Sequence, residues 1–149
     1  MFNSKKDKYE DLYYAAEHAR DLAYAPYSKF KVGAALLVRP GEDSIVPKNK
    51  IYTGVNIENS SFEATICAER VAFAKAISEG ELENRKDDKS PFIAIAISAG
   101  DEQEAVPCGI CRQFMYEFAP GLDVITKTNG VIRTRNLKEL FPDGFELKK

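Results

Sequence analysis

The residues best suited to chemistry are three cysteines that lie in two separate segments. Cys67 lies in the first segment, while Cys108 and Cys111 follow a proline in the second, as Pro107-Cys108-x-x-Cys111. Three thiolates can bind one Zn²⁺ and leave its fourth position open to water, which distinguishes a catalytic zinc site from a structural one. Glu69, two residues beyond Cys67, is a carboxylate placed to exchange protons with that water. The spacing therefore predicts one Zn²⁺ per chain, with Glu69 as the catalytic acid/base.

Other uses of the cysteines and of the histidine fit the sequence less well. A disulfide framework would leave one of the three thiols over, and nothing in the chain indicates an oxidising compartment. Three unrelated buried thiols would not need the Cys-x-x-Cys spacing, and a structural Cys₄ site would need a fourth cysteine. His18, the single histidine, stands in a charge-rich segment and is expected to be solvated or satisfied rather than a metal ligand.

The elements that must position these residues are predicted from the spacing of apolar side chains. Helices are expected over residues 5–24, from a cap at Thr65 to Gly80, and from Cys108 until Pro120, with a helical turn over 137–140. Strands are expected over residues 30–39, 51–56, 92–98, 122–126 and 131–133. The first two strands form a hairpin, and its connection over 40–50 is expected to be exposed. This order predicts a single layered α/β domain over residues 1–149, with a mixed sheet. Loops 81–90 and 101–106 receive no chemical role.

Both cysteine segments fall at predicted helix starts, where the helix dipole favours a thiolate over a thiol. Zn²⁺ with three thiolates carries a net charge of about −1, which weakens its pull on water. Arg70 and Arg112 each follow a cysteine segment directly. The alternative is that both are solvated surface arginines, but their placement favours a position beside the ligands, where they restore positive charge near the metal.

Composition narrows the class of protein further. The chain has 149 residues, 44% of them hydrophobic, and a net charge of −2, so no basic footprint for nucleic acid is present. Its apolar runs are too short to span a membrane, and the N-terminal residues lack the apolar core of a signal peptide. These features predict a cytoplasmic protein with no nucleic-acid or membrane partner.

At these motifs the sequence resembles the small, homotetrameric cytidine deaminases. The resemblance extends over most of the chain and is carried by Ala25-Pro26-Tyr27-Ser28-x-Phe30-x-Val32-Gly33-Ala34-Ala35, Thr53-Gly54-Val55-Asn56-Ile57-Glu58-Asn59, Cys67-Ala68-Glu69-Arg70, Pro107-Cys108-Gly109-x-Cys111-Arg112-Gln113 and Glu139-Leu140-Phe141-Pro142-x-x-Phe145. It implies a central five-stranded sheet with helices on both faces and a homotetramer with shared active sites. It also implies zinc-dependent hydrolytic deamination of cytidine and 2′-deoxycytidine in pyrimidine salvage.

The resemblance also implies roles for individual residues. The positions matching Asn56 and Glu58 bind the ribose hydroxyls, and the position matching Phe30 stacks on the pyrimidine. Backbone groups around Ala68 and Cys108 read the amide edge of the base, and the position matching Phe145 packs against substrate in a neighbouring subunit. The chain departs from the pattern at Phe62, where family members commonly carry tyrosine, so any hydrogen bond from that hydroxyl is lost here.

Three other functions are compatible with parts of the pattern. A deaminase of a different small amine, such as the nucleoside antibiotic blasticidin S, would share the cysteines and Glu69, but Asn56-x-Glu58 fits a plain ribose better. Editing of a polynucleotide would need basic and aromatic residues interleaved along a strand-binding surface. A zinc- or nucleoside-binding module without activity would have no need of Glu69.

Overall fold

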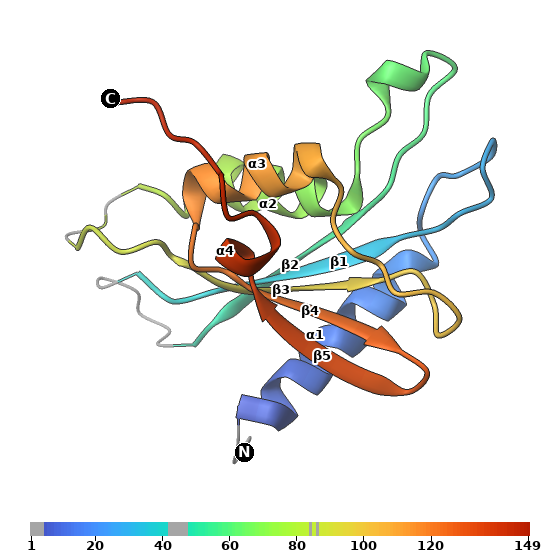
Figure 1. Ribbon diagram of the computed structural model, residues 1–149, viewed down its shortest axis with the longest axis horizontal. Coiled ribbons are helices and arrows are strands. Elements are labelled where there is room, and N and C mark those ends of the chain that lie inside the picture. The colour runs from blue at the N-terminus through green and yellow to red at the C-terminus, as the bar shows by residue number, and fades with distance from the viewer. Residues whose placement is uncertain (1–4, 42–47, 84, 86) are drawn as a thin grey trace.

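A central sheet of five strands organises the chain (Figure 1). The computed structural model describes residues 5–41, 48–83, 85 and 87–149, with side chains from Tyr9 onward. The strands are β1 (Gly33–Val38), β2 (Lys50–Val55), β3 (Phe92–Ser98), β4 (Asp123–Thr128) and β5 (Val131–Asn136). Their order is β2-β1-β3-β4-β5, with β3 and β4 parallel and every other neighbouring pair antiparallel. The prediction of a mixed sheet is confirmed.

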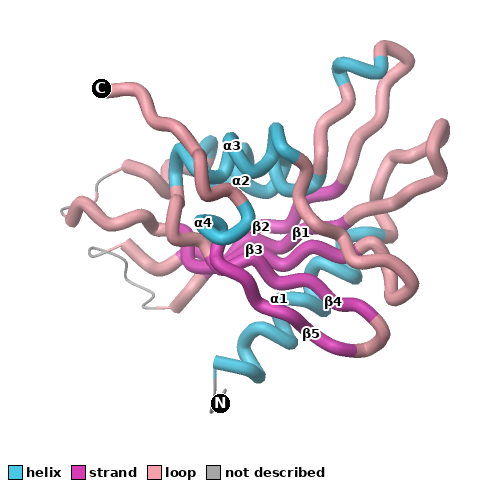
Figure 2. The backbone as a smooth tube through the Cα atoms, in the orientation of Figure 1, coloured by secondary structure: helices cyan, strands magenta, loops and turns pink. Residues whose placement is uncertain are grey.

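Helices cover both faces of this sheet, as expected (Figure 2). Helix α1 (Lys5–Arg20) packs on one face, and α2 (Ala68–Ser78), α3 (Gly109–Phe118) and the short α4 (Leu137–Leu140) pack on the other. Alternate residues of β1 serve the two layers, because Ala34 and Leu36 join the α2–α3 core while Ala35 and Leu37 join the α1 core. A strand buried on both faces needs the continuous apolar run found in its sequence.

Close packing of α2 on β2 depends on Gly54. A Cβ at this position would lie 2.3 Å from the carbonyl oxygen of Ala68, the first residue of α2. The missing side chain lets the N-terminus of α2 lie directly on the sheet. This approach fixes where the helix begins and therefore where Cys67 and Glu69 lie.

Tertiary contacts move two predicted helix boundaries. α1 ends at Arg20 rather than at residue 24, because Tyr24 forms backbone hydrogen bonds with Asn56 (3.0 Å) and Glu58 (2.8 Å). Thr65 does not cap α2: Ile66 exchanges two backbone hydrogen bonds of 3.0 Å with Ile57, which holds this stretch extended. The N-cap of α2 is Cys67 itself.

Most strands differ from the expectation at their ends. β1 spans Gly33–Val38 and is shorter than the predicted 30–39, because the Phe30 carbonyl and the Val32 N–H bond the Asn56 side chain instead of a neighbouring strand. β3 matches its predicted bounds, and β4 and β5 are longer than predicted, reaching Thr128 and Asn136. Much of the predicted excursion over 40–50 lies outside the described residues, because 42–47 are not described. Within the described part of the chain, no helix has the length and apolar character needed to cross a membrane.

Candidate metal centre and substrate cavity

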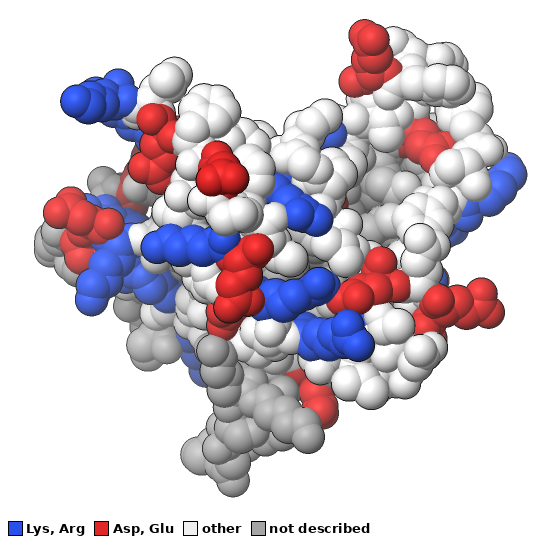
Figure 3. All heavy atoms as spheres, in the orientation of Figure 1, with Lys and Arg blue, Asp and Glu red and all other residues white. Residues whose placement is uncertain are grey.

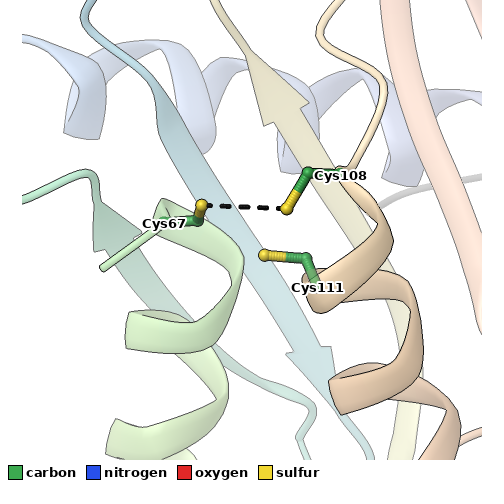
Figure 4. A group of neighbouring side chains, drawn as sticks. All are labelled: Cys67, Cys108 and Cys111. Atoms are coloured by element: carbon green, nitrogen blue, oxygen red, sulfur yellow. Dashed lines mark hydrogen bonds between the residues drawn. The ribbon is translucent and has the colours of Figure 1, made fainter. Parts of the chain in front are cut away.

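Two helix N-termini bring the three cysteines together (Figure 4). Cys67 is the N-cap of α2, Cys108 is the N-cap of α3, and Cys111 lies one turn into α3. The sulfurs of all three point toward one another and lie within 4.8 Å of each other, with 4.0 Å between Cys67 Sγ and Cys108 Sγ. In the ranges that the structure describes, this trio is the cluster whose side chains suit a metal ion. The predicted ligand set is therefore assembled in one place.

The geometry of these sulfurs fits zinc. A tetrahedral ion with Zn–S distances of ~2.3 Å holds pairs of sulfurs ~3.8 Å apart. The 4.0 Å between Cys67 and Cys108 is close to that value, and the thiols are free rather than disulfide-bonded. Among the described residues no fourth protein ligand joins these three soft donors, which would leave one coordination position of a bound zinc for water or substrate.

Glu69 is buried beside the cysteines in the first turn of α2, with 5% of its surface exposed. Burial raises the pKa of its carboxyl to about 7, and the negative charge of Cys67 adds to the rise, while its own backbone N–H and Arg70 act in the opposite direction. A carboxyl group with a pKa near neutrality can both accept and donate protons at working pH. The predicted acid/base therefore has the surroundings that this role requires.

Arg70 also lies beside the ligands. Its Nη2 is 3.8 Å from Cys67 Sγ and 3.4 Å from the carbonyl oxygen of Thr65. The pKa of Cys67 is lowered to about 5, first by a hydrogen bond from Cys111 and then by Arg70 and Cys108, against the effect of burial. Cys111, which donates to Cys67, has its pKa raised in turn. Cys67 therefore ionises before Cys111.

Arg112 has different contacts from those expected. Its Nε donates to the carbonyl oxygen of Pro107 (2.7 Å), and its Nη1 donates to the carbonyl oxygen of Leu140 (2.6 Å). The guanidinium therefore ties the residue before Cys108 to the end of α4. Its hydrogen bonds are to backbone carbonyls rather than to sulfur, so Arg112 supports the shape of the cysteine loop.

A cavity of about 290 Å³ opens in front of the cysteines. It is lined by Phe30, Val32, Asn56, Thr65, Cys67, Ala68, Glu69, Ile97, Gln103, Glu104, Ala105, Val106 and Cys108. Two loops that project beyond the sheet, before β1 and before α2, flank a hollow in the surface (Figures 1 and 3). The volume lies near the lower end of the range for small-molecule pockets, ~300–1,000 Å³. Phe30, Asn56 and Ala68, each predicted to meet substrate, all line this cavity.

Asn56 already has backbone partners. Its Nδ2 donates to the carbonyl oxygen of Phe30 (2.8 Å), and its Oδ1 accepts from the backbone N–H of Val32 (2.8 Å). The amide therefore holds the loop that carries Phe30 against the end of β2. One lone pair on Oδ1 and one N–H remain available to a ligand.

Glu58 lies outside this cavity, in an adjoining hollow lined by Tyr27, Ser28, Glu58, Phe62 and Thr65. Its carboxylate accepts hydrogen bonds from the backbone of Tyr27 (2.8 Å) and Ser28 (3.2 Å) and from the Ser28 hydroxyl. The Ser28 hydroxyl first, then these two N–H groups and the charge of Lys29, lower the pKa of the carboxyl. Thr65 lines both spaces, so Glu58 borders the cavity without entering it in this chain.

Phe145 lies in a C-terminal tail that runs along α3. The tail is tied to α3 by a hydrogen bond from Gln113 Nε2 to the Phe145 carbonyl oxygen (3.0 Å) and by Lys149 with Glu117 (2.9 Å). Glu117 is in the last turn of α3, so the tail leads away from the cysteines (Figure 1). The Phe145 side chain is 63% exposed and does not line the cavity of its own chain.

Sequence reasoning missed much of the cavity wall. Residues 103–106 were expected to be a loop without a role, yet all four line the cavity. A possible signal was their position, because the loop connects an interior strand to the helix that begins at Cys108. His18 is exposed on α1, as predicted.

Comparison with known proteins agrees with this geometry. Residues 6–126 match the family described as the cytidine and deoxycytidylate deaminase zinc-binding region. Since the match covers most of the chain, the chain belongs to this family of zinc-binding deaminases.

Particular cytidine deaminases are similar to this chain over nearly their full length, and a blasticidin-S deaminase is similar over about three-quarters of its length. A cytidine deaminase of Sporosarcina psychrophila is 42% identical over 138 residues, which is 91% of this chain and 90% of that protein. The crystal structure of cytidine deaminase from Burkholderia pseudomallei has a TM-score of 0.76 at 38% identity, covering 91% of this chain and 98% of that chain. A blasticidin-S deaminase of Bacillus cereus is 30% identical over 120 residues, covering 77% of this chain and 76% of that protein.

Proposed function

We propose that the protein catalyses the hydrolytic deamination of cytidine and 2′-deoxycytidine to uridine and 2′-deoxyuridine, with release of ammonia. The observation that carries the proposal is a buried carboxylate, Glu69, lining the same cavity as Cys67 and Cys108, next to the Cys111 ligand. The similarity to cytidine deaminases over about nine-tenths of the chain supports the choice of substrate.

The chemistry divides between the metal and Glu69. Cys67, Cys108 and Cys111 would hold the zinc, which would make a water molecule acidic enough to be a nucleophile near neutral pH. Glu69 takes a proton from the attacking water and delivers it to N3 of the pyrimidine, so that the ring can accept electrons at C4. Glu69 then moves the remaining proton of that water, now on the hydroxyl at C4, to the amino group, so that the C4–N bond breaks, ammonia leaves and the C4 carbonyl forms. One water molecule is consumed for each nucleoside, and the carboxylate returns to its starting state.

The cavity wall supports recognition of a pyrimidine. Phe30, Val32 and Ile97 supply apolar surface for a planar ring, and backbone groups around Ala68 and Cys108 are available to its polar edge. The free lone pair and N–H of Asn56 suit a ribose hydroxyl. Glu58 can reach the same sugar only across the border with the adjoining hollow.

Unphosphorylated nucleosides are the substrates we favour. The residues that line the cavity include two carboxylates, Glu69 and Glu104, and no lysine or arginine. Glu58 adds a third acidic group in the adjoining hollow. A phosphate group inside the cavity would meet no lysine or arginine among the lining residues and would lie near the carboxyl group of Glu69.

A second candidate is deamination of blasticidin S or a similar modified cytosine nucleoside. The similarity to a blasticidin-S deaminase favours it, at lower identity than to the cytidine deaminases. The two candidates share the zinc and Glu69 and differ only in what the rest of the cavity accepts.

The test is ammonia release from a panel of substrates by protein of measured metal content. We expect about one zinc per chain, turnover of cytidine and deoxycytidine, and little turnover of cytosine, adenosine or cytidine 5′-monophosphate. A chelator should abolish turnover, and added zinc should restore it. Protein with a full complement of zinc that releases ammonia from blasticidin S but not from cytidine would favour the second candidate. No release from any nucleoside would contradict both.

We further propose that the active unit is a homotetramer with shared active sites, acting in cytoplasmic pyrimidine salvage. The exposed Phe145 and Leu147 on the α3-bound tail support a contact with another copy, because apolar side chains exposed together mark interaction surfaces. A site that needs three reduced thiols suits a reducing compartment. Light scattering that gives the mass of a fully active monomer would contradict the tetramer.

A further inference from the structure

The loop between β3 and α3 forms one wall of the cavity, but little regular structure supports it. Gln103, Glu104, Ala105 and Val106 line the cavity, as does Phe30 from the loop before β1. A backbone hydrogen bond within the loop joins Val106 N–H to the Glu104 carbonyl (3.2 Å). Side-chain contacts must therefore set how close this wall lies to the ligand.

Glu104 supplies such contacts. Although it lines the cavity, its carboxylate turns toward the sheet and accepts hydrogen bonds from the Thr126 hydroxyl (2.6 Å) and from Arg135 Nη2. Arg133 Nη1 lies 3.8 Å from its other oxygen. Thr126 is fully buried, and the Glu104 side chain is only 19% exposed, so water competes weakly for these bonds.

The register of the sheet explains why these groups converge. Thr126 in β4 is paired with Arg133 in β5, and Val124 is paired with Arg135. Cross-strand partners share a face of the sheet, and Val124 belongs to the core under α2 and α3. Thr126, Arg133 and Arg135 therefore all present side chains on the face that carries the cavity.

The far end of the wall is attached to the same part of the fold. Arg112 bonds the carbonyl oxygens of Pro107 and Leu140, and Leu140 ends α4, which directly follows β5. Residues 104–107 are thus held to the β5–α4 unit at both ends. The cysteines lie at the starts of α2 and α3, so the part of the wall that Glu104 holds can change position while Arg112 keeps Pro107, next to Cys108, in place.

We propose that Glu104 is a positioning residue that holds the cavity wall 103–106 in place for substrate through Thr126 and Arg135. The inference rests on the proposed function, which supplies the nucleoside. Without the Glu104 contacts, a smaller fraction of the molecules has the wall in the position that binds substrate. The apparent affinity for substrate is the intrinsic affinity multiplied by that fraction, so it falls as the fraction falls. Chemistry in the bound state is unchanged, because Glu104 bonds to the sheet and not to the reacting atoms.

The experiment compares zinc-loaded variants. Glu104→Ala and Arg135→Met should each raise the KM for cytidine about tenfold and leave kcat within about twofold, and the double variant should be no worse than either single variant. Glu104→Gln, which keeps neutral hydrogen bonds, should recover part of the loss. Glu102→Ala, an exposed neighbour in the same loop, is the matched control and should behave like the parent. Hydrogen exchange in residues 101–106 should be faster in Glu104→Ala, with α2 unchanged.

Each other outcome contradicts a specific part of the argument. An unchanged KM in Glu104→Ala overturns the proposal. A harmful Glu104→Ala beside a harmless Arg135→Met also overturns it, because Glu104 would then act on substrate directly. A raised KM together with lost zinc or a lower Tm would reduce Glu104 to a general structural residue. If the parent deaminates no nucleoside, the proposed function fails by itself, and the exchange rates alone decide whether Glu104 positions the wall.

Discussion

Two buried glutamates, one at each end of α2, have opposite electrostatic surroundings. Glu69 in the first turn is 5% exposed, and burial raises its pKa to about 7. Glu81, just beyond the helix, is 6% exposed, yet its pKa is lowered. Burial alone would raise that pKa too, but Lys50 Nζ (2.5 Å), the Tyr52 hydroxyl (2.7 Å) and Arg85 Nη2 (3.4 Å) surround the carboxylate and reverse the effect.

The contrast separates a structural carboxylate from a reactive one. A buried acid surrounded by cations and donors stays ionised, and its function is to hold those partners together. A buried acid whose pKa lies near neutrality keeps its capacity to exchange a proton. Both residues have little exposed surface, but the Glu69 carboxyl lies deeper in the protein than that of Glu81, so depth and neighbours together decide which role each residue has.

The largest expected effect is on catalysis at Glu69. Glu69→Gln keeps the shape of the side chain and removes its proton transfer, so kcat should fall by ~10⁴-fold or more. Zinc content and nucleoside binding should remain. Steady-state kinetics with metal analysis would measure both, and Glu81→Gln is the matched control, because it neutralises a buried carboxylate near the same helix. Activity of Glu69→Gln within a few-fold of the parent would end its assignment as proton shuttle.

The next effect is on stability at Glu81. Glu81→Gln leaves Lys50 and Arg85 without their counter-charge, and should lower the free energy of unfolding by about 3 kcal/mol. Below its melting temperature the variant should keep the kcat of the parent. Urea denaturation followed by circular dichroism measures the change, with the exposed Glu83→Gln as control. An unchanged unfolding midpoint would show that the contacts of Glu81 contribute nothing net.

A smaller effect is the pH dependence of that difference. Because the folded pKa of Glu81 is lowered, its stabilising contribution is present above the unfolded pKa, near 4.5, and is lost as pH falls through the folded value. The stability gap between the parent and Glu81→Gln should therefore narrow as the pH falls from neutral to ~3. Denaturation at several pH values measures this gap. A gap that widens as the pH falls would show that the sign is wrong.

The smallest effect concerns the two arginines near the ends of α2, Arg70 and Arg85. Arg70, 3.8 Å from Cys67 Sγ, helps to balance the charge of the thiolates, so Arg70→Gln should lower kcat or zinc affinity about tenfold. Arg85→Gln, at the other end, should reduce stability and leave kcat unchanged. Zinc titration and kinetics on both variants make the comparison. Equal losses of kcat in the two would argue against a specific role for Arg70.

Local patterns were sufficient for much of the fold and for the metal site. β3 could be predicted because a strand buried on both faces needs an uninterrupted apolar run, as in Phe92–Ser98. Cys108 and Cys111 could be assigned together because residues at the start of one helix have a fixed spacing. Glu69 followed from its position near Cys67 in the first turn of α2. These are short-range relations, which a sequence states directly.

Contacts between residues that are far apart in the chain could not be predicted from the sequence. Thr65 is a residue type that often caps helices, but the backbone hydrogen bonds between Ile57 and Ile66 hold this stretch extended. Cys67 is the N-cap of α2 instead. Glu81 falls in a loop to which the sequence assigns no role, and only the folded structure places Lys50 and Tyr52 of β2 beside it.

The cavity shows the same division most clearly. The sequence determined that Cys67, Cys108, Cys111 and Glu69 would lie at helix starts. Only the tertiary structure decided that the Glu58 carboxylate accepts a hydrogen bond from the backbone N–H of Tyr27. It also decided that Glu104 accepts hydrogen bonds from Thr126 in β4 and Arg135 in β5. The side chain of a charged residue contacts whatever the packed layers bring within reach, and residues 104 and 135 meet only because β4 and β5 pair in one particular register.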